Sequence, residues 1–169
     1  MSDLNVKEYD MKAKKAQNAH IDIDNRQKSI KLTVSHRAII RKAVKAVLEY
    51  EDFPFDAEVS VSVVTVPEIH ALNKIYRDKD RPTDVLSFPQ HEDGEWENGH
   101  GVVTLGDVVL CADILSTQSV SFGHTFEREL AYLTIHSVLH LLGYEHEDGG
   151  EEERIMTEKQ NELIKILGL

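Results

Sequence analysis

Two histidines four residues apart are the side chains of this sequence that are best placed to do chemistry. His136 and His140 lie in an apolar stretch that contains neither proline nor glycine until Gly143. They should therefore lie one above the other on one face of an α-helix. Gly143 can adopt the left-handed conformation that ends a helix and turns the chain, so that His146 returns over the same face. The sequence thus predicts three imidazoles that converge on one metal ion.

The order H-x3-H-x2-G-x2-H favours a catalytic metal centre over three unrelated histidines. A single histidine on an apolar helix is more often a packing or surface residue. This spacing, however, is that of the zinc-binding motif of metzincin proteases. Three nitrogen ligands leave the fourth position of Zn²⁺ to water, as in catalytic sites. We expect one zinc ion, although nickel, manganese and iron also accept imidazole.

The residue after the first histidine bears on which bond such a site would hydrolyse. Zinc lowers the pKa of a bound water to about 7 and can stabilise a negatively charged transition state. In zincin peptidases a glutamate at this position is the general base. Here the residue is Ser137, whose hydroxyl has too high a pKa to replace it. A peptidase is therefore disfavoured, and Arg77, at the end of a predicted helix, offers a guanidinium suited to phosphate.

The composition limits the classes of protein to which this chain can belong. The chain has 169 residues, of which 41% are hydrophobic and 29% charged, as expected for one globular domain. We assign that domain to residues 19–169, preceded by a flexible, polar N-terminal arm at residues 1–18. The arm lacks a hydrophobic signal core, no apolar run could span a membrane, and the single cysteine, Cys111, excludes an internal disulfide. We therefore expect a soluble cytoplasmic protein without a membrane partner.

The charge distribution leaves one surface on which RNA could bind. A net charge of −11 argues against a protein that coats nucleic acid, but binding depends on where charge is concentrated. The main internal basic cluster consists of Lys74, Arg77, Lys79 and Arg81. A solvated helix end and loop explains these four residues as well as a contact with nucleic acid does. Both interpretations stay open at this point.

Hydrophobic periodicity predicts the elements that must position these residues. Four stretches are expected to be strands: 20–26, 57–65, 83–89 and 105–111. Five helices are expected, at about 36–50, 67–77, 114–121, 126–142 and 151–167. The predicted N-caps of three of them are Ser35, Asp113 and Thr125. The last two strands should be antiparallel, since the surface loop 90–101 between them is too short to hide a crossover helix. The predicted fold is α+β and zincin-like: a mixed four-stranded sheet covered by about five helices, with the metal site on a central buried helix.

Three sequence blocks resemble the YbeY family of bacterial metal-dependent endoribonucleases, also called rRNA maturation factors. They are LNKIYRDKDRPTDVLSFP at residues 72–89, LGDVVL at 105–110 and HSVLHLLGYEHED at 136–148. The resemblance extends over about residues 20–168. It implies a zinc-dependent, single-strand-specific endoribonuclease that acts in ribosomal RNA maturation, notably at the 3′ end of 16S RNA, and in ribosome quality control. Ribosomal RNA, and the ribosome or its assembly proteins, would be its partners.

The resemblance also assigns roles to individual residues. Carried over position by position, it makes His136, His140 and His146 the zinc ligands and Arg77 the functionally important arginine. As a separate hypothesis, Arg77 neutralises charge that develops on the phosphodiester, while the other three residues of the basic cluster steer the RNA backbone. Whether water or the ribose 2′-hydroxyl attacks stays open, as does the general base. Glu129 is expected to support the site or to face solvent.

Two other functions fit the same residues. One is a metallopeptidase whose general base is Glu145 or Glu147, in which case unstructured peptides and not RNA would be cleaved. The other is a ribosome assembly factor with structural zinc. Zinc would then have a fourth protein ligand, and replacement of Arg77 by alanine would leave its activity in cells intact.

Overall fold

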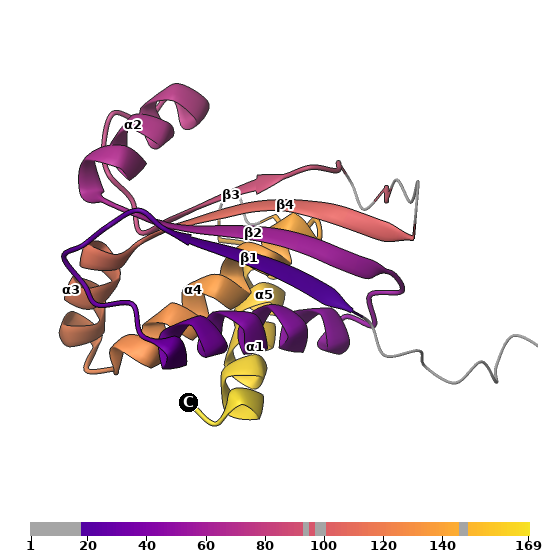
Figure 1. Ribbon diagram of the computed structural model, residues 1–169. Coiled ribbons are helices and arrows are strands. Elements are labelled where there is room, and N and C mark those ends of the chain that lie inside the picture. Colours follow the sequence, from indigo (N-terminus) through magenta and orange to yellow (C-terminus); the bar gives the residue numbers. More distant parts are fainter. Residues whose placement is uncertain (1–17, 93–94, 97–100, 146–148) are drawn as a thin grey trace, which may run out of the picture.

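The computed structural model describes residues 18–92, 95–96, 101–145 and 149–169. Over these residues, strands and helices follow one another in the predicted order (Figure 1). The elements are β1 (Ala19–Asn25), α1 (Val34–Tyr50), β2 (Asp56–Val64), α2 (Val66–Arg77), β3 (Val85–Pro89), β4 (Val102–Cys111), α3 (Ala112–Phe122), α4 (Phe126–Leu141) and α5 (Glu151–Leu167). Most of the predicted arm and His146 lie outside the described residues. None of the helices within the described ranges is long and apolar enough to cross a membrane.

The four strands form one mixed sheet in the order β1-β2-β4-β3. β1, β2 and β4 are parallel, whereas β3 pairs with β4 in the antiparallel sense, as predicted. Successive side chains of a strand point to opposite faces. Val108 and Leu110 of β4 therefore join the large core on one face, while Val109 and Cys111 join a small core on the other.

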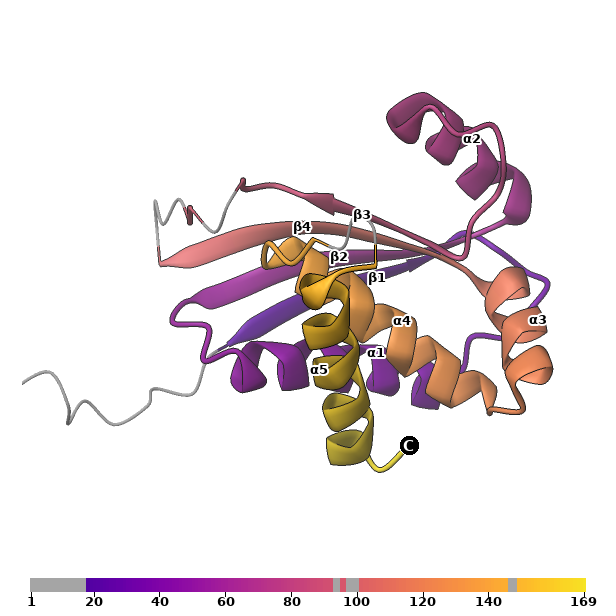
Figure 2. The ribbon, with the colours of Figure 1, turned by 180° about the vertical axis from the view of Figure 1, so that it is seen from behind.

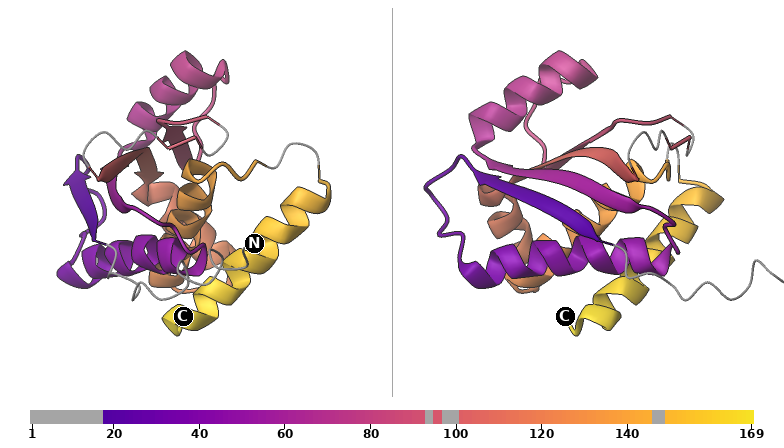
Figure 3. Two further views of the ribbon diagram at one scale, coloured as in Figure 1. Left: turned by 90° about the vertical axis from the view of Figure 1, so that its right-hand side faces the viewer. Right: turned by 45° about the vertical axis from the view of Figure 1, so that its right-hand side comes forward.

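Helices cover the two faces of the sheet unequally (Figure 2). α1, α4 and α5 lie on one face, and α2 packs on the other, against β3 and β4. α4 contacts α1, α3, α5, β3 and β4, and ten of its residues are buried. Figure 3 shows α5 crossing beneath the sheet beside α1 and α4. The helix that carries the two histidines is therefore the central helix of the large core, as its apolar residues predicted.

Two of the predicted helix caps are wrong. α1 is capped by Thr33, whose hydroxyl accepts a hydrogen bond from the His36 amide (3.1 Å), while His36 Nδ1 accepts one from the Thr33 amide (3.3 Å). Ser35 lies exposed in the first turn instead. α3 follows β4 directly, with Cys111 at the cap position, so that Asp113 lies inside the first turn. In both cases the observed cap lies two residues before the predicted cap, because the preceding loop or strand leads directly into the helix.

β3 and β4 approach one another closely at Gly106. Gly106 pairs with Pro89 and has a φ of +138°. A Cβ atom at this position would lie 2.1 Å from the carbonyl oxygen of Phe88. On the other side of β4, the register with β2 shifts between Glu58 and Val59. The absence of a side chain at Gly106 thus lets the edge strand β3 pair with an irregular strand.

Candidate active site

α4 has the start and the end that its sequence predicts. The hydroxyl of Thr125 accepts a hydrogen bond from the Arg128 amide at 3.1 Å, which confirms the predicted N-cap. Glu127 and Glu129 lie in the first turn. At the other end the Gly143 amide donates to the His140 carbonyl, and Gly143 has a φ of +101°. The predicted left-handed glycine therefore turns the chain directly after the two histidines.

The His136 and His140 rings face one another on a single side of α4, as predicted. Their Nε2 atoms are 3.0 Å apart and their ring centroids 4.6 Å apart. His140 Nδ1 donates to the carbonyl oxygen of Tyr144 at 2.6 Å. His136 Nδ1 lies 3.1 Å from the side-chain amide of Gln160, a buried residue of α5. Each ring is thus held at its Nδ1 atom, and the two Nε2 atoms point to one place.

This arrangement fits the donor set of a metal site. A carbonyl oxygen can only accept, so the proton of a neutral His140 ring lies on Nδ1, and Nε2 carries the lone pair that a metal needs. Ligating histidines commonly hold their second nitrogen in this way, which fixes the tautomer and the ring orientation. Gln160 offers both a donor and an acceptor. The structure places the amide nitrogen of Gln160 at His136 Nδ1, where it donates to that atom. With the amide turned by about 180°, its oxygen accepts from Nδ1–H, and His136 adopts the same tautomer as His140.

The third predicted ligand, His146, lies outside the described residues. Among the residues that the structure does describe, no three histidine, cysteine or acidic side chains gather where they could hold a metal ion. The last described turn before His146 is nevertheless firmly held. Tyr144 accepts from His140 through its carbonyl and donates from its hydroxyl to Glu51 at 2.6 Å. Two imidazole donors are therefore in place, and the complete triad stays a prediction.

β3 connects Arg77 with the histidine helix. Arg77 Nη2 donates to the carbonyl oxygen of Ser87 at 2.5 Å, and the guanidinium lies over the Phe88 ring, 5.4 Å from its centroid. The Ser87 hydroxyl in turn hydrogen-bonds that of Ser137 at 2.7 Å. Ser137 directly follows His136 in α4, so one residue of the edge strand contacts both the arginine and the histidine helix. Sequence reasoning missed this link, because nothing local marks two serines 50 positions apart as partners.

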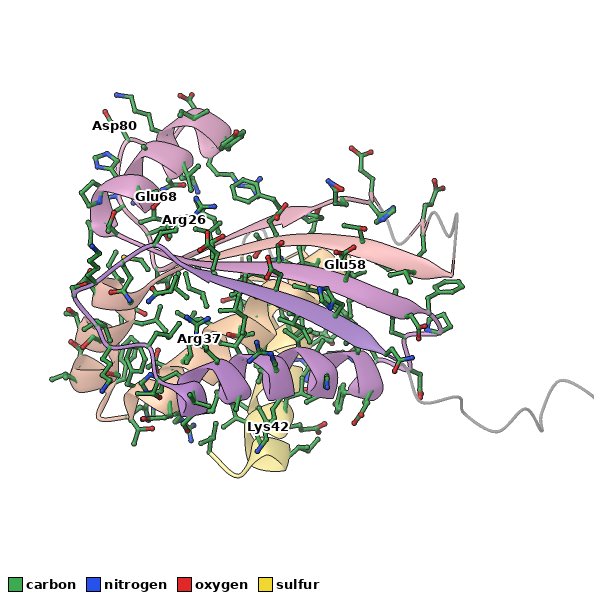
Figure 4. The ribbon with its side chains drawn as sticks, in the orientation of Figure 1. Arg26, Arg37, Lys42, Glu58, Glu68 and Asp80 are labelled. Carbon is green, nitrogen blue, oxygen red and sulfur yellow. The ribbon has the colours of Figure 1, made fainter. Side chains whose placement is uncertain are left out.

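The other three members of the basic cluster belong to α2 and to the loop after it, on the opposite face of the sheet from α4. Lys74 pairs with Asp80 at 3.1 Å, and Asp80 also contacts His70 at 2.7 Å. The hydrogen bond with His70 is the largest single cause that lowers the pKa of the Asp80 carboxyl, followed by the hydrogen bond and the charge of Lys74. The side chains of His70, Lys74 and Asp80 are all exposed, and exposed ion pairs contribute little to stability. Figure 4 shows Asp80 beside α2, at the outer end of the molecule. The proposed role of Lys74, Lys79 and Arg81 in steering RNA stays a prediction.

Glu129 is buried and does not face solvent, with 6% of its surface exposed. Burial raises the pKa of its carboxyl, and the negative charge of Asp84 raises that pKa further. Positive charges on His124 and Arg128 act in the opposite direction. Glu127, two residues nearer the start of α4, shows the reverse. Its pKa is lowered by a backbone hydrogen bond at the N-terminus of α4 and by His36.

Replacing each glutamate by glutamine should change stability in opposite directions. Glu129→Gln removes an acid whose raised pKa weakens the folded state as the pH rises above about 4. The variant should therefore gain stability relative to wild type between pH 4 and pH 7. Glu127→Gln should be less stable than wild type at pH 7, and this difference should shrink as the pH falls below about 4, because a lowered pKa stabilises the folded protein only while the carboxyl is ionised. Urea unfolding at about pH 3, 4 and 7 measures the two differences, and equal pH dependence in the two variants would contradict the assignment.

Fold and site together define the class of protein: an α+β domain whose central helix, beneath a mixed four-stranded sheet, carries a histidine pair held at both Nδ1 atoms. The profile of one protein family, described as Endoribonuclease YbeY, matches residues 22–168 of this chain. The chain belongs to the YbeY family, as its three sequence blocks indicated.

Relatives and a solved structure agree with this assignment. Endoribonuclease YbeY of Thermoanaerobacter sp. is 46% identical over 158 residues, which cover 89% of this chain and 98% of that protein. The protein of the same name from Caldanaerobacter subterraneus subsp. tengcongensis is 45% identical over 154 residues, with coverage of 87% and 96%. A solution structure from Thermotoga maritima matches with a TM-score of 0.57 at 33% identity, over 86% of this chain and 87% of that one. The predicted α+β fold with a mixed four-stranded sheet is thereby confirmed, whereas its zincin-like character stays a prediction.

Proposed function

We propose that this protein is a zinc-dependent endoribonuclease that hydrolyses phosphodiesters of single-stranded RNA. One observation carries the proposal: the Nε2 atoms of His136 and His140 point to one place, 3.0 Å apart, while each Nδ1 atom is held by a neighbour. Those two histidines and His146 would hold the metal. When bound, zinc supplies positive charge that stabilises a negatively charged transition state and favours loss of a proton from water. Membership of a family named for endoribonuclease activity supports RNA as the substrate.

The residues around the pair orient it and bind the substrate. Gln160 and the Tyr144 carbonyl fix the two rings, so that little reorganisation is needed during the reaction. Arg77 uses one N–H group on the Ser87 carbonyl, and a guanidinium has five in all. The remaining donors are suited to the oxygens of a phosphate, on which negative charge develops. Contact with Phe88 keeps the guanidinium at the edge strand while it does so.

In the cell, we propose that this activity serves ribosomal RNA maturation at the 3′ end of 16S RNA and ribosome quality control. The support is the family resemblance of the three sequence blocks, which contain Arg77, the middle of β4 and the histidines. The partners would then be the ribosome, which contains the RNA end that is processed, and its assembly proteins. The acidic net charge of −11 is consistent with recognition of a limited RNA segment and not with a general coating of nucleic acid.

Removal of the metal tests the proposal directly. The purified protein should contain about one zinc per chain and cut a single-stranded RNA faster than the same sequence in a duplex. Chelation should abolish cleavage, because the metal supplies the central charge of the site, and one equivalent of zinc should restore it. Undiminished cleavage by protein shown to be free of metal would overturn the metal-dependent part of the proposal. Cleavage of unstructured peptides with RNA left intact would overturn its substrate.

Replacing Arg77 by alanine should lower the turnover rate on RNA by about 100-fold, the effect of losing one donor that stabilises transition-state charge. Zinc content should not change, because Arg77 is held by Ser87 and Phe88 of β3 and is not a proposed metal ligand. Arg41→Ala, at an exposed position of α1, is the matched control and should keep wild-type activity. If the two alanine variants cleave RNA equally well, Arg77 has no part in the reaction.

A further inference from the structure

A hollow of about 290 Å³ lies at the turn that follows the histidine pair, lined by Leu142, Gly143 and Tyr144 among others. Its lining includes the aromatic rings of Phe53, Trp96 and Tyr144 and the carboxylate of Glu51. Tyr144 belongs to both places, because its carbonyl oxygen holds His140 while its side chain lines the hollow. Gly143, in the turn between them, lines the hollow as well. A ligand in this hollow would therefore contact the same turn that holds the His140 ring.

The aromatic rings form a pre-arranged platform. Phe53 is 3% exposed and packs edge-to-face against Trp96, with ring centroids 5.2 Å apart and an angle of 83°. His91 contacts the Trp96 ring from a second direction, at 5.6 Å. Trp96 itself is only half-buried. An indole ring that is held by its neighbours and still partly open to solvent is the kind of surface on which unpaired nucleobases stack.

Glu51 gives the hollow a polar side that accepts hydrogen bonds. One of its carboxylate oxygens accepts from Lys159 at 2.8 Å, and the other from the Tyr144 hydroxyl at 2.6 Å. Lys159 lies over the rings of Tyr50 and Tyr144, at 5.1 and 5.3 Å from their centroids. A carboxylate has about four lone-pair positions, so these two bonds leave capacity for donors of a ligand.

We propose that this hollow is a nucleobase subsite, which receives one unstacked base of the RNA next to the phosphate that is cleaved. The inference rests on the proposed function and names how its substrate is held. A carboxylate beside aromatic rings repels a phosphate but suits a base, which has a flat face for stacking and N–H groups on its edge. Guanine, adenine and cytosine carry an amino group that can donate to Glu51. Uracil has only one edge N–H, flanked by two carbonyl oxygens, and should bind least well.

Fluorescence of Trp96 can test the subsite without any cleavage, because this is the one tryptophan of the chain. The full-length protein is titrated with GMP, AMP, CMP and UMP, with ribose 5-phosphate as the control that lacks a base. Free N-acetyltryptophanamide corrects for light absorbed by the nucleotides. We expect saturable quenching by the first three nucleotides, a dissociation constant several-fold higher for UMP, and no quenching by ribose 5-phosphate. Absence of quenching by every nucleotide, or equal quenching by ribose 5-phosphate, would overturn the inference.

Variants separate the subsite from the nuclease proposal. Trp96→Ala should raise KM for single-stranded RNA about tenfold, as expected for the loss of one stacked base, while zinc content stays at the wild-type level. Trp96→Phe, which keeps an aromatic face, should restore most of the affinity. Glu51→Gln should reduce the difference between the dissociation constants of GMP and UMP. If wild type cleaves RNA and Trp96→Ala has an unchanged KM, the subsite is wrong and the nuclease stands. If wild type binds nucleotides in the hollow but cleaves no RNA, the nuclease proposal fails and the hollow remains a base site.

Discussion

His140→Ala is expected to lower the rate of RNA cleavage by more than about 100-fold and to release the zinc. Loss of a group that merely orients a metal ligand already costs 10- to 100-fold in affinity or activity, and His140 is proposed as a ligand itself. The substitution removes the Nε2 atom that lies 3.0 Å from His136 and also the donor to the Tyr144 carbonyl. Metal content per chain and cleavage of a single-stranded RNA should therefore fall together.

The control for this variant is His20→Ala, at an exposed position of β1. It should keep both zinc and activity. Circular dichroism and urea unfolding of the His140→Ala protein show whether its fold is intact. A folded His140→Ala protein that keeps one zinc per chain and cleaves RNA at the wild-type rate would remove the basis of the metal site. The same comparison excludes a contaminating nuclease, which would be unaffected by the substitution.

Gly106→Ala is expected to have the largest effect on stability, a loss of about 3 to 5 kcal/mol in the free energy of unfolding. Its φ of +138° is unfavourable for any residue with a side chain. In addition, the new Cβ would lie 2.1 Å from the Phe88 carbonyl oxygen, so β3 would have to move away from β4. Because Ser87 of β3 contacts both Arg77 and Ser137, RNA cleavage should fall as well. Urea unfolding and the RNA assay measure the two effects.

Gly123→Ala separates the close approach of the strands from backbone strain alone. Gly123 also has a positive φ, +69°, but no heavy atom of the described residues lies within 4 Å of the place where its Cβ would be. Gly123→Ala should lower the free energy of unfolding by about 1 to 2 kcal/mol. RNA cleavage should not change, since Gly123 ends α3 and does not belong to β3. Equal losses of stability in the two variants would mean that the clash with the Phe88 carbonyl adds nothing to the effect of Gly106→Ala.

The sequence predicted the parts of this protein that depend on local patterns. Alternating residues identified the strands, and the spacing of His136, His140 and Gly143 placed both imidazoles on one helix face before a left-handed turn. The caps of α1 and α3 were wrong, because a polar residue near a helix start can lie either at the cap or inside the first turn. The local sequence at Ser35 and Asp113 does not distinguish these positions.

The contacts that complete the candidate site could not be predicted, because they join residues that are distant in sequence. Gln160 is 24 positions from His136, and Tyr144 is 93 positions from Glu51. Trp96 belongs to a stretch expected to be a surface loop, yet it packs against Phe53 at the edge of the large core. Periodicity states which face of an element is buried. It does not state which side chain of another element meets that face.

The position of Gln160 on α5 has a consequence for protein synthesis. α5 is translated after every other element that the structure describes, so a growing chain already contains both histidines of α4 before the residue that holds the His136 ring exists. An incomplete chain would carry the pair with one ring unsupported. If the protein cleaves RNA, this order of synthesis delays the support of the His136 ring until α5 has been made.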